Sequence, residues 1–361
     1  MKLSRLGEFG LIDRVRRTTP KSRNVLLGIG DDAAWVTSKT GSCLITSDIL
    51  IEGVHFNLKW TSLFDLGYKA LAVNLSDIAA MGGIPAYLIL SLGIPADFDS
   101  VDIDEFYRGI RSLAAKSGVA LVGGDTSVAE SLVISACVVG HAPFRPVTRG
   151  GAKPRDDIYV TGTLGDSALA LTLLQNKSRQ AKKEPLAYLL KRHHQPTPRL
   201  AAGALLARDR LATAMIDVSD GLLQDLSHIC KASNIGAVVW KDRVPLSRAY
   251  RMLAGRDDTR HAFSGGEDYE LLFCARQRHR SRIEKSPQRA GVAMTRIGTC
   301  VPARHGIVVL DRSDKPISIG SQGHDHFKSI KSVSKGRLIN NIWPSVATLG
   351  NNRYRWTRSA S

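Results

Sequence analysis

The chain has 361 residues, 43% of them hydrophobic, which is enough for two domains with substantial cores. Its formal net charge of +17 is typical of proteins that meet nucleic acid or an anionic surface. The N-terminus lacks the apolar run of a signal peptide, and the most apolar stretch, residues 86–95, is too short to cross a bilayer. With five scattered cysteines and no CxxC pair, the sequence predicts a soluble, cytoplasmic protein with reduced thiols.

Apolar runs of strand and helix length alternate through the first part of the chain. The predicted strands are 43–46, 87–92, 119–122 and 132–139, and the predicted helices are 65–81 and 101–116. A stretch rich in Pro, Gly and Arg follows at 143–154, and we expect the domain boundary near it.

The second part of the chain repeats this alternation. The predicted strands are 157–160, 215–218, 237–240, 271–274, 296–299 and 307–310, and the predicted helices are 166–174, 199–208 and 222–230. Residues 175–184 are polar and basic and predict a loop. Both parts therefore predict a mixed α/β fold, with helices and strands interspersed.

Aspartates occur repeatedly where a predicted strand meets a turn. The segments are GIGDDAAW at 28–35, ITSD at 45–48, NLSDIAAMGG at 74–83, VGGDTS at 122–127 and DVSDG at 217–221. If the fold brings them together, the carboxylates need a cation, and Mg²⁺ with its phosphate ligands is the natural choice.

Asp77 is the most informative of these residues. In the predicted helix 65–81 it continues the apolar stripe of Leu66, Ala70 and Val73, so its carboxylate points toward the core. A carboxylate there is costly unless it is paired or binds a metal. A buried Asp satisfied by backbone amides or an arginine is the alternative, and it stays open on this residue alone.

The other aspartates have ordinary explanations as well. Asp31, Asp32 and Asp125 follow glycines and fit Asp-rich turns. Ser219 or Asp220 could be the N-cap of the helix that begins near 222, or could lie beside a phosphate and Mg²⁺ at that helix end. No P-loop, kinase-type or dinucleotide motif is present in the sequence, so any ATP binding depends on carboxylate-bound Mg²⁺.

Seven segments, taken in order, closely resemble the thiamine-monophosphate kinase family of the aminoimidazole ribonucleotide synthetase superfamily. They are GIGDDAAW, TSDILIEGVHF, NLSDIAAMGGIP, LVGGDTS, VTGTLGDSALAL, IDVSDGLLQDL and SGGEDYELLF, between residues 28 and 273. The resemblance implies a two-domain α/β fold whose N-terminal domain dimerises through its sheet. It also implies ATP-dependent phosphorylation of thiamine monophosphate to thiamine diphosphate, the last step of that biosynthesis, by in-line transfer assisted by several Mg²⁺ ions.

The resemblance also implies domain limits and residue roles. Residues 1–145 would form the Mg-ATP-binding and dimerisation domain, and 146–327 the domain that completes the substrate site. Residues 328–361 extend beyond the family pattern, and their composition predicts a disordered basic extension. The implied Mg²⁺ ligands are Asp31, Thr46, Ser47, Asp48, Asp77, Asp125, Asp217 and Asp220. The implied ATP contacts are Thr46, Tyr107, Gly124, Asp125, Arg149 and Ser219. The implied contacts to thiamine monophosphate are His55, Glu267 and His324. No general base is implied, and the role of Asp32 stays open.

Two features depart from the family pattern. His324 stands in GHDHF where the family has another aromatic residue that packs on the thiamine. Residues 328–361 extend the chain with seven Lys and Arg and no acidic residue, which allows a weak contact with RNA or anionic lipid.

Other functions remain possible on the sequence alone. Another enzyme of the same superfamily, such as aminoimidazole ribonucleotide synthetase or selenophosphate synthetase, would also use Mg-ATP and acidic motifs. The net charge would also fit a nucleic-acid-binding protein with a degenerate enzyme fold, although such a module would gain nothing from a buried carboxylate cluster.

Overall fold

The structure, a computed structural model, describes residues 7–20, 22–38, 41–176, 182–255 and 258–319. Residues 12–324 form one compact unit, and residues 1–11 group with 325–361 in another, of which only 7–11 are described. His324 and the extension 328–361 lie outside the described residues, so their proposed roles stay predictions. In the described part of the chain, no helix has the length and apolar character needed to cross a membrane.

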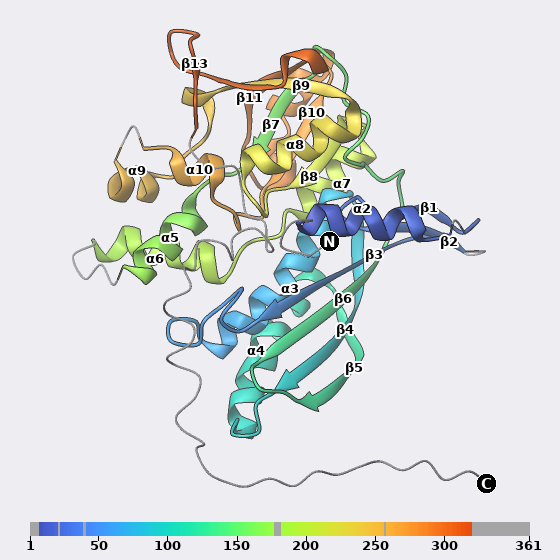
Figure 1. The fold of residues 1–361 in the computed structure, drawn as a ribbon, viewed down its shortest axis with the longest axis vertical. Coiled ribbons are helices and arrows are strands. Elements are labelled where there is room, and N and C mark those ends of the chain that lie inside the picture. Colours follow the sequence, from blue (N-terminus) through green and yellow to red (C-terminus); the bar gives the residue numbers. More distant parts are fainter. Residues whose placement is uncertain (1–6, 21, 39–40, 177–181, 256–257, 320–361) are drawn as a thin grey trace, which may run out of the picture. The chain divides into compact units, whose positions relative to one another are not determined.

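The first part of the chain builds a six-stranded sheet in the order β1-β2-β3-β6-β4-β5 (Figure 1). Its strands are β1 (Val25–Leu27), β2 (Ala34–Ser38), β3 (Gly41–Ile51), β4 (Ile84–Ile94), β5 (Ala120–Val128) and β6 (Val133–His141). Its helices are α2 (Glu8–Thr18), α3 (Leu63–Ala80) and α4 (Ser100–Ser117). β4 and β5 run parallel, whereas the other neighbouring strands are antiparallel.

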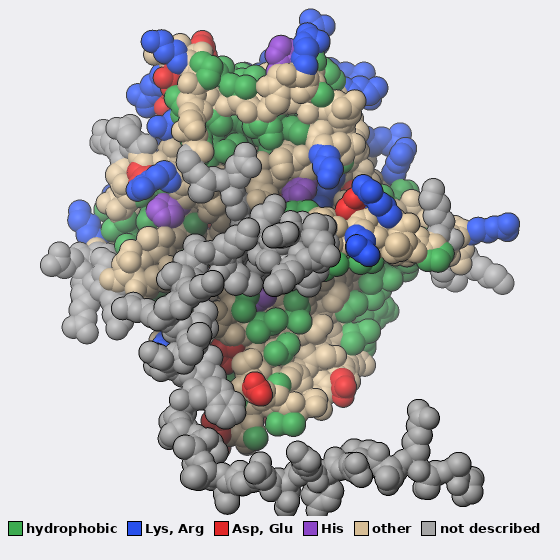
Figure 2. Space-filling model, in the orientation of Figure 1, with side chains coloured by type: hydrophobic (Ala, Val, Ile, Leu, Met, Phe, Trp, Pro, Cys, Tyr) green, Lys and Arg blue, Asp and Glu red, His purple; other side chains and the backbone are tan. Residues whose placement is uncertain are grey.

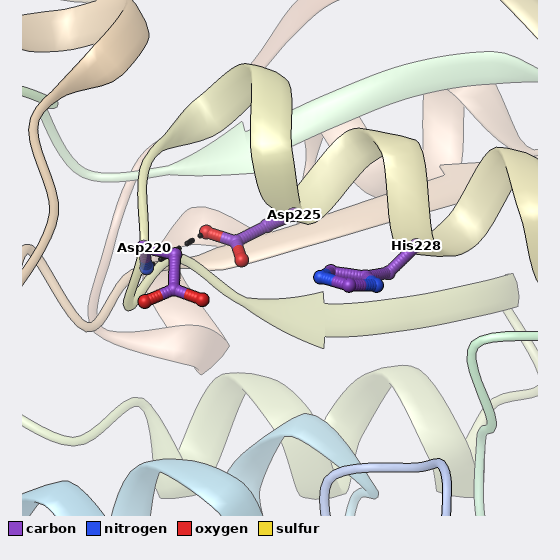
Figure 3. A group of neighbouring side chains, drawn as sticks. All are labelled: Asp220, Asp225 and His228. Carbon is purple, nitrogen blue, oxygen red and sulfur yellow. Dashed lines mark hydrogen bonds between the residues drawn. The ribbon is translucent and has the colours of Figure 1, made fainter. Parts of the chain in front are cut away.

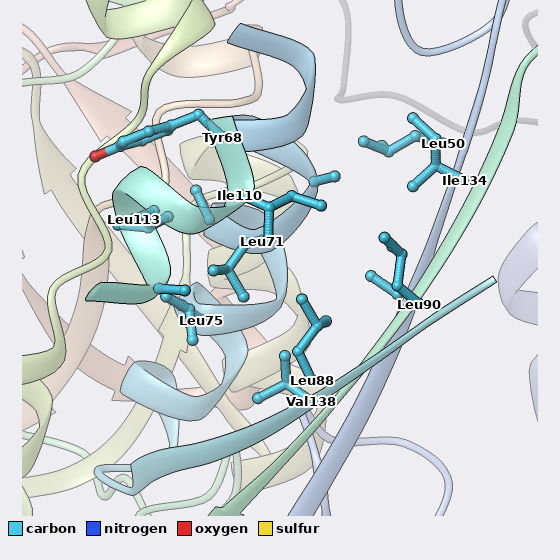
Figure 4. Packing of buried hydrophobic residues seen from close by; sticks show 14 of the residues in the cluster. Leu50, Tyr68, Leu71, Leu75, Leu88, Leu90, Ile110, Leu113, Ile134 and Val138 are labelled. Carbon is cyan, nitrogen blue, oxygen red and sulfur yellow. The ribbon is translucent and has the colours of Figure 1, made fainter. Parts of the chain in front are cut away.

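Helices α3 and α4 pack on each other, and their apolar faces cover one face of this sheet (Figure 4). Leu71 and Leu75 of α3 belong to the same buried cluster as Leu88 of β4 and Val138 of β6. The two helices cross at glycines, since a Cβ at Gly67 would lie 2.0 Å from the carbonyl oxygen of Phe106. A side chain at this crossing would therefore force the helices apart.

Hydrophobic side chains are exposed on the opposite face of this sheet. Burial alternates along β3 and β6, as expected for strands covered on one side. The exposed residues, called the outer face here, include Ile45, Ile49, Tyr87 and Ile89. In Figure 2 hydrophobic side chains show over the lower part of the view, around β3 to β6, whereas Lys and Arg gather over the upper part.

The second part of the chain builds a seven-stranded sheet in the order β13-β12-β9-β11-β7-β10-β8. Its strands are β7 (Asp157–Thr161), β8 (Ala212–Asp217), β9 (Ile235–Trp240), β10 (Leu271–Ala275), β11 (Met294–Pro302), β12 (Ile307–Leu310) and β13 (Pro316–Ile317). Its helices are α5 (Asp166–Gln175), α6 (Lys183–His194), α7 (Leu200–Arg208), α8 (Leu222–Ser233), α9 (Arg248–Ala254), α10 (Arg260–Ser264), α11 (Arg280–Glu284) and α12 (Pro287–Ala290). Strands β7 and β10 are buried along their whole length, which explains the apolar run Ile158–Val160 in β7 and the continuous apolar sequence of β10.

The mixed α/β class predicted for both parts is confirmed, but three local predictions were wrong. Helix α6 was missed, because its charged residues conceal the buried positions Pro185, Leu189 and His193 at intervals of four. Asp48 and Asp125 lie inside β3 and β5 rather than at strand ends. The strand predicted at 119–122 continues through both glycines to Val128, because its pairing with β4 extends that far.

Candidate active site

Three carboxylates from distant parts of the sequence meet where the two sheets' elements adjoin. One carboxylate oxygen each of Asp32, Asp77 and Asp217 lies within 4.8 Å of the others. Asp32 follows β1, Asp77 lies in the last turn of α3 and Asp217 ends β8. The core-facing direction predicted for Asp77 is confirmed, since Leu66, Ala70 and Val73 on the same stripe are all buried.

Neighbouring polar side chains orient these carboxylates. The Thr46 hydroxyl donates to Asp77 Oδ2 at 2.5 Å, and the Ser76 hydroxyl donates to Asp217 Oδ2 at 2.6 Å. The main-chain N–H of Asp48 donates to the Asn74 side chain at 3.1 Å, which ties β3 to α3 beside the cluster. The carboxylates are thereby held in place before any ligand binds.

Arg149 connects Asp31 and Asp32 to the second part of the chain. Its guanidinium Nη2 lies 2.9 Å from Asp32 Oδ1, and its main-chain N–H donates to Asp31 Oδ2 at 3.1 Å. The role left open for Asp32 is therefore partly answered, because it joins the cluster and pairs with Arg149. Asp31 and Asp32 are adjacent in the sequence but contact different groups of Arg149, the main-chain N–H and the guanidinium. The sequence alone could not predict which of the two makes which contact.

Burial and repulsion between carboxylates act on Asp77 and Asp217 of the cluster, and burial acts also on the nearby Asp31 and Asp48. Burial raises the pKa of Asp48 to about 6. Burial and the Asp32 charge raise the pKa of Asp31 to about 7 and that of Asp217 to about 8. Burial, followed by the charges of Asp48 and Asp217, raises the pKa of Asp77 well above its usual range. Carboxylates that repel each other in this way, together with the Thr46 hydroxyl, make an all-oxygen donor set that fits Mg²⁺.

A second group lies around Glu267, in the segment between α10 and β10. The Lys69 ammonium of α3 lies 2.6 Å from Glu267 Oε1, and His193 Nδ1 lies 3.5 Å from Glu267 Oε2. The main-chain N–H of Glu267 donates to Ser219 O at 2.8 Å, so this segment packs on the loop that follows Asp217. Lys69 and His193 could not be predicted from the sequence, because a single Lys or His in a helix carries no distinguishing pattern.

His55, the other described residue expected to contact thiamine monophosphate, has a fixed orientation. Its Nδ1 accepts a hydrogen bond from the main-chain N–H of Ile51 at 3.0 Å. In the neutral ring the proton therefore sits on Nε2, which is left as the donor nitrogen. His55 also contributes to the electrostatic environment of Glu267.

A third group surrounds Asp220 at the start of α8 (Figure 3). Asp220, Asp225 and His228 each place one ligand atom within 4.8 Å of the others. Asp225 accepts from the main-chain N–H of Asp220 at 3.2 Å and of Gly221 at 3.0 Å. The N-cap interpretation of Ser219 or Asp220 was wrong, because the cap position is Gly221 and Asp225 reaches back to satisfy these amides.

Several predicted site residues are not brought to the cluster within one chain. Ser47 points to the opposite face of β3 from Thr46, and its hydroxyl donates to Ala136 O at 3.1 Å. Gly124 and Asp125 lie on β5, which β6 and β4 separate from β3. At the usual strand spacing this places Asp125 about 14 Å from Asp48 across the sheet. Tyr107 lies on α4, partly buried against the core.

Known proteins share both halves of this architecture. The family models described as AIR synthase related protein match residues 30–142 (N-terminal domain) and 153–311 (C-terminal domain). A thiamine-monophosphate kinase of Escherichia coli strain K12 is 42% identical over 325 residues, covering 89% of this chain and 98% of that protein. The chain belongs to the thiamine-monophosphate kinase family. The Bacillus subtilis thiamine-monophosphate kinase is 35% identical and covers 90% of this chain and 100% of its own length.

Solved structures of the thiamine-monophosphate kinase family agree with the fold. AaThiL complexed with AMPPCP and TMP superimposes with a TM-score of 0.77 at 33% identity, covering 90% of this chain and 99% of that one. The thiamine-monophosphate kinase of Stenotrophomonas maltophilia K279a gives 0.70 at 41% identity, covering 84% and 96%. The Escherichia coli hydrogenase maturation protein HypE, at 18% identity, TM-score 0.61 and coverage of 77% and 86%, shares the fold alone. The resemblance and the mixed α/β fold it implied are therefore confirmed, whereas dimerisation through the sheet stays a prediction.

Proposed function

We propose that this chain transfers the γ-phosphoryl group of ATP to the phosphate of thiamine monophosphate and releases thiamine diphosphate and ADP. The buried carboxylate cluster, drawn from both parts of the chain, carries this proposal. Its support is a relative of the same fold, AaThiL, that was solved with AMPPCP and TMP. A cluster of raised-pKa carboxylates at a domain junction is the arrangement expected of an ion-assisted phosphoryl transfer site.

The acceptor is already a phosphate oxygen, so the reaction needs no strong general base. Asp31, Asp48, Asp77, Asp217 and the Thr46 hydroxyl would hold the Mg²⁺ ions, with Asp220 extending the set. When bound, these ions would neutralise charge on the triphosphate and the acceptor phosphate. The in-line geometry and the use of several ions belong to this proposal.

The remaining predicted residues receive proposed roles that fit their chemistry. Arg149, held by Asp32, offers a planar donor fork to nucleotide phosphates. Ser219 lies beside the N-terminus of α8, where the positive end of the helix dipole favours an anion. Glu267 and His55, with His324 outside the described residues, would contact thiamine monophosphate.

The direct test measures ADP release from Mg-ATP by the full chain, with thiamine monophosphate as acceptor. Thiamine and the precursor of aminoimidazole ribonucleotide are the control acceptors. We expect turnover with thiamine monophosphate alone, and identification of thiamine diphosphate as the product. Turnover with the aminoimidazole precursor, or none with any acceptor, would contradict the proposal.

We further propose that two copies pair through the outer face and that each copy supplies Asp125 to the other's site. Ile49 and Ile89 on this face are 49% and 42% exposed, which is costly for a chain working alone. Asp125 pairs with Ser91, whose neighbours Leu90 and Leu92 are buried, so it faces outward with the apolar residues. Because Asp125 is far from Asp48 within one chain, a second copy is the natural source of this ligand.

The activity of mixed dimers tests whether Asp125 of one copy acts in the site of the other. Asp77→Asn and Asp125→Asn should each inactivate the protein when present in every subunit. When the two are unfolded, mixed and refolded together, each mixed dimer keeps one intact site, so about a quarter of the wild-type activity should return. Two copies of one variant refolded together serve as the control. If mixing restores nothing although mixed dimers form, Asp125 does not act across the interface.

A further inference from the structure

Lys69 is a buried charge that the proposed reaction does not use. It lies in α3 and is 4% exposed, and its ammonium contacts Glu267 Oε1 at 2.6 Å. Placing an ammonium group in such a position is costly unless a partner compensates it. Lys69 precedes Ser76 by two helical turns, so the two side chains leave the same face of α3. Ser76 reaches Asp217 and Lys69 reaches Glu267, which links both sites to one helix.

Glu267 is held more tightly than an ordinary loop residue. Its backbone has a φ of 66°, in the left-handed region that non-glycine residues rarely adopt. Its N–H is fixed on Ser219 O, and its side chain keeps 27% of its surface exposed. A residue with a constrained backbone and a partly exposed carboxylate is suited to contact a ligand.

Lys69 supplies the positive charge in this group, and His193 does not. Burial lowers the pKa of His193 to about 3, so the ring is neutral at neutral pH, and its Nδ1 is 2.9 Å from the Ser167 hydroxyl. Burial acts to raise the pKa of Glu267, but the charge of the nearby Lys69 ammonium and its hydrogen bond act against burial, and that pKa is lowered. The Lys69 contact therefore keeps Glu267 ionised and fixes one of its two oxygens.

We propose that Lys69 is a positioning residue for the acceptor: it anchors Glu267 Oε1, so that the carboxylate is charged and correctly turned toward the cationic thiazolium ring of thiamine monophosphate. This rests on the proposed function. Fixing the carboxylate in advance removes the side-chain ordering that substrate binding would otherwise have to accomplish. Lys69 acts through Glu267 and affects acceptor binding rather than the transfer step.

The test compares Lys69→Met, Glu267→Gln and the double variant of the full chain. We expect Lys69→Met to raise KM for thiamine monophosphate about ten-fold or more, while KM for ATP and kcat stay within about two-fold. In the Glu267→Gln background the same change should add less than about two-fold, because the group through which Lys69 acts is gone. Lys69→Arg, which keeps the charge, should recover part of the affinity.

A control variant separates positioning from the general loss of an ion pair to a carboxylate. Arg280→Met removes a cation 2.6 Å from the buried Asp157, on the second sheet, and should lower stability without raising KM for thiamine monophosphate. If Lys69→Met raises KM for thiamine monophosphate and KM for ATP alike, or has its full effect in the Glu267→Gln background, Lys69 only stabilises the fold and does not position Glu267.

Calorimetric binding of thiamine monophosphate without ATP separates the two proposals. Wild-type protein that binds it but forms no thiamine diphosphate overturns the proposed reaction, and the affinities of the variants then decide the role of Lys69. Wild-type protein that neither binds nor converts it overturns both. Equal affinity of wild type and Lys69→Met overturns the role of Lys69 alone.

Discussion

Asp77→Asn lowers thiamine diphosphate formation about 1000-fold or more, in our expectation, while the protein stays folded. Asn keeps the size of the side chain and an oxygen that can accept from the Thr46 hydroxyl. It removes the negative charge that lies beside Asp32 and Asp217 at the centre of the cluster. The rate of ADP release with saturating thiamine monophosphate checks the expectation.

The control for this variant is an aspartate away from the site. Asp209→Asn changes a residue that pairs with Arg208 at the surface, and the rate should be unchanged. Thermal unfolding of both variants verifies that they are folded, and Asp77→Asn should be at least as stable as wild type in the absence of metal. A rate within ten-fold of wild type would exclude Asp77 as a ligand of the transferring site.

Without Mg²⁺, the protein should lose stability as the pH rises from about 6.5 to about 8.5. The pKa values of Asp31 and Asp217 are near 3.8 in the unfolded chain, and burial raises them to about 7 and about 8 in the folded one. Burial also raises the pKa of Asp268, outside the cluster, to about 8. The folded state binds their protons more tightly, so the stabilisation is complete below the unfolded pKa and disappears as the pH rises through the folded values. We expect Tm to fall by about 5 °C over this range.

Between about pH 6.5 and about 8.5, the buried histidines contribute little to the change in stability. Burial lowers the pKa of His193 to about 3 and of His228 to about 4, so their contribution to stability changes mainly below about pH 6.5. Millimolar Mg²⁺ should reverse the part of the fall that comes from the cluster, because an ion that binds only the folded state stabilises it. The part that comes from Asp268 should remain. A Tm that stays flat without Mg²⁺, or a fall of equal size in Asp217→Asn, would show that Asp217 is not a source of the fall.

Much of the site could be predicted from the sequence because helical periodicity is a local signal. The apolar stripe of α3 was sufficient to predict that Asp77 points toward the core, and the structure confirms this direction. Ser76 and Asp217 are 141 positions apart along the chain, and no local sequence pattern can predict a contact between such distant residues. The contact of Lys69 with Glu267 was missed for the same reason.

The remaining errors arose where tertiary pairing overrode local composition. Gly123 and Gly124 predicted a turn, yet hydrogen bonding to β4 extends the strand through both. The Asp220 segment looked like a helix cap, yet Asp225 from inside α8 satisfies those amides. The basic sequence of α6 concealed three buried positions.

Helix α3 also fixes the distance between the residues that contact Glu267 and the carboxylate cluster. Lys69 and Ser76 stand two turns apart, which at the rise of an α-helix is about 10 Å. The close crossing of α4 at Gly67 leaves this helix little freedom to slide. The interval between Lys69, which contacts Glu267, and Ser76, which contacts Asp217, is thus set by the rise of the helix, so the surrounding loops can lengthen or shorten without altering it.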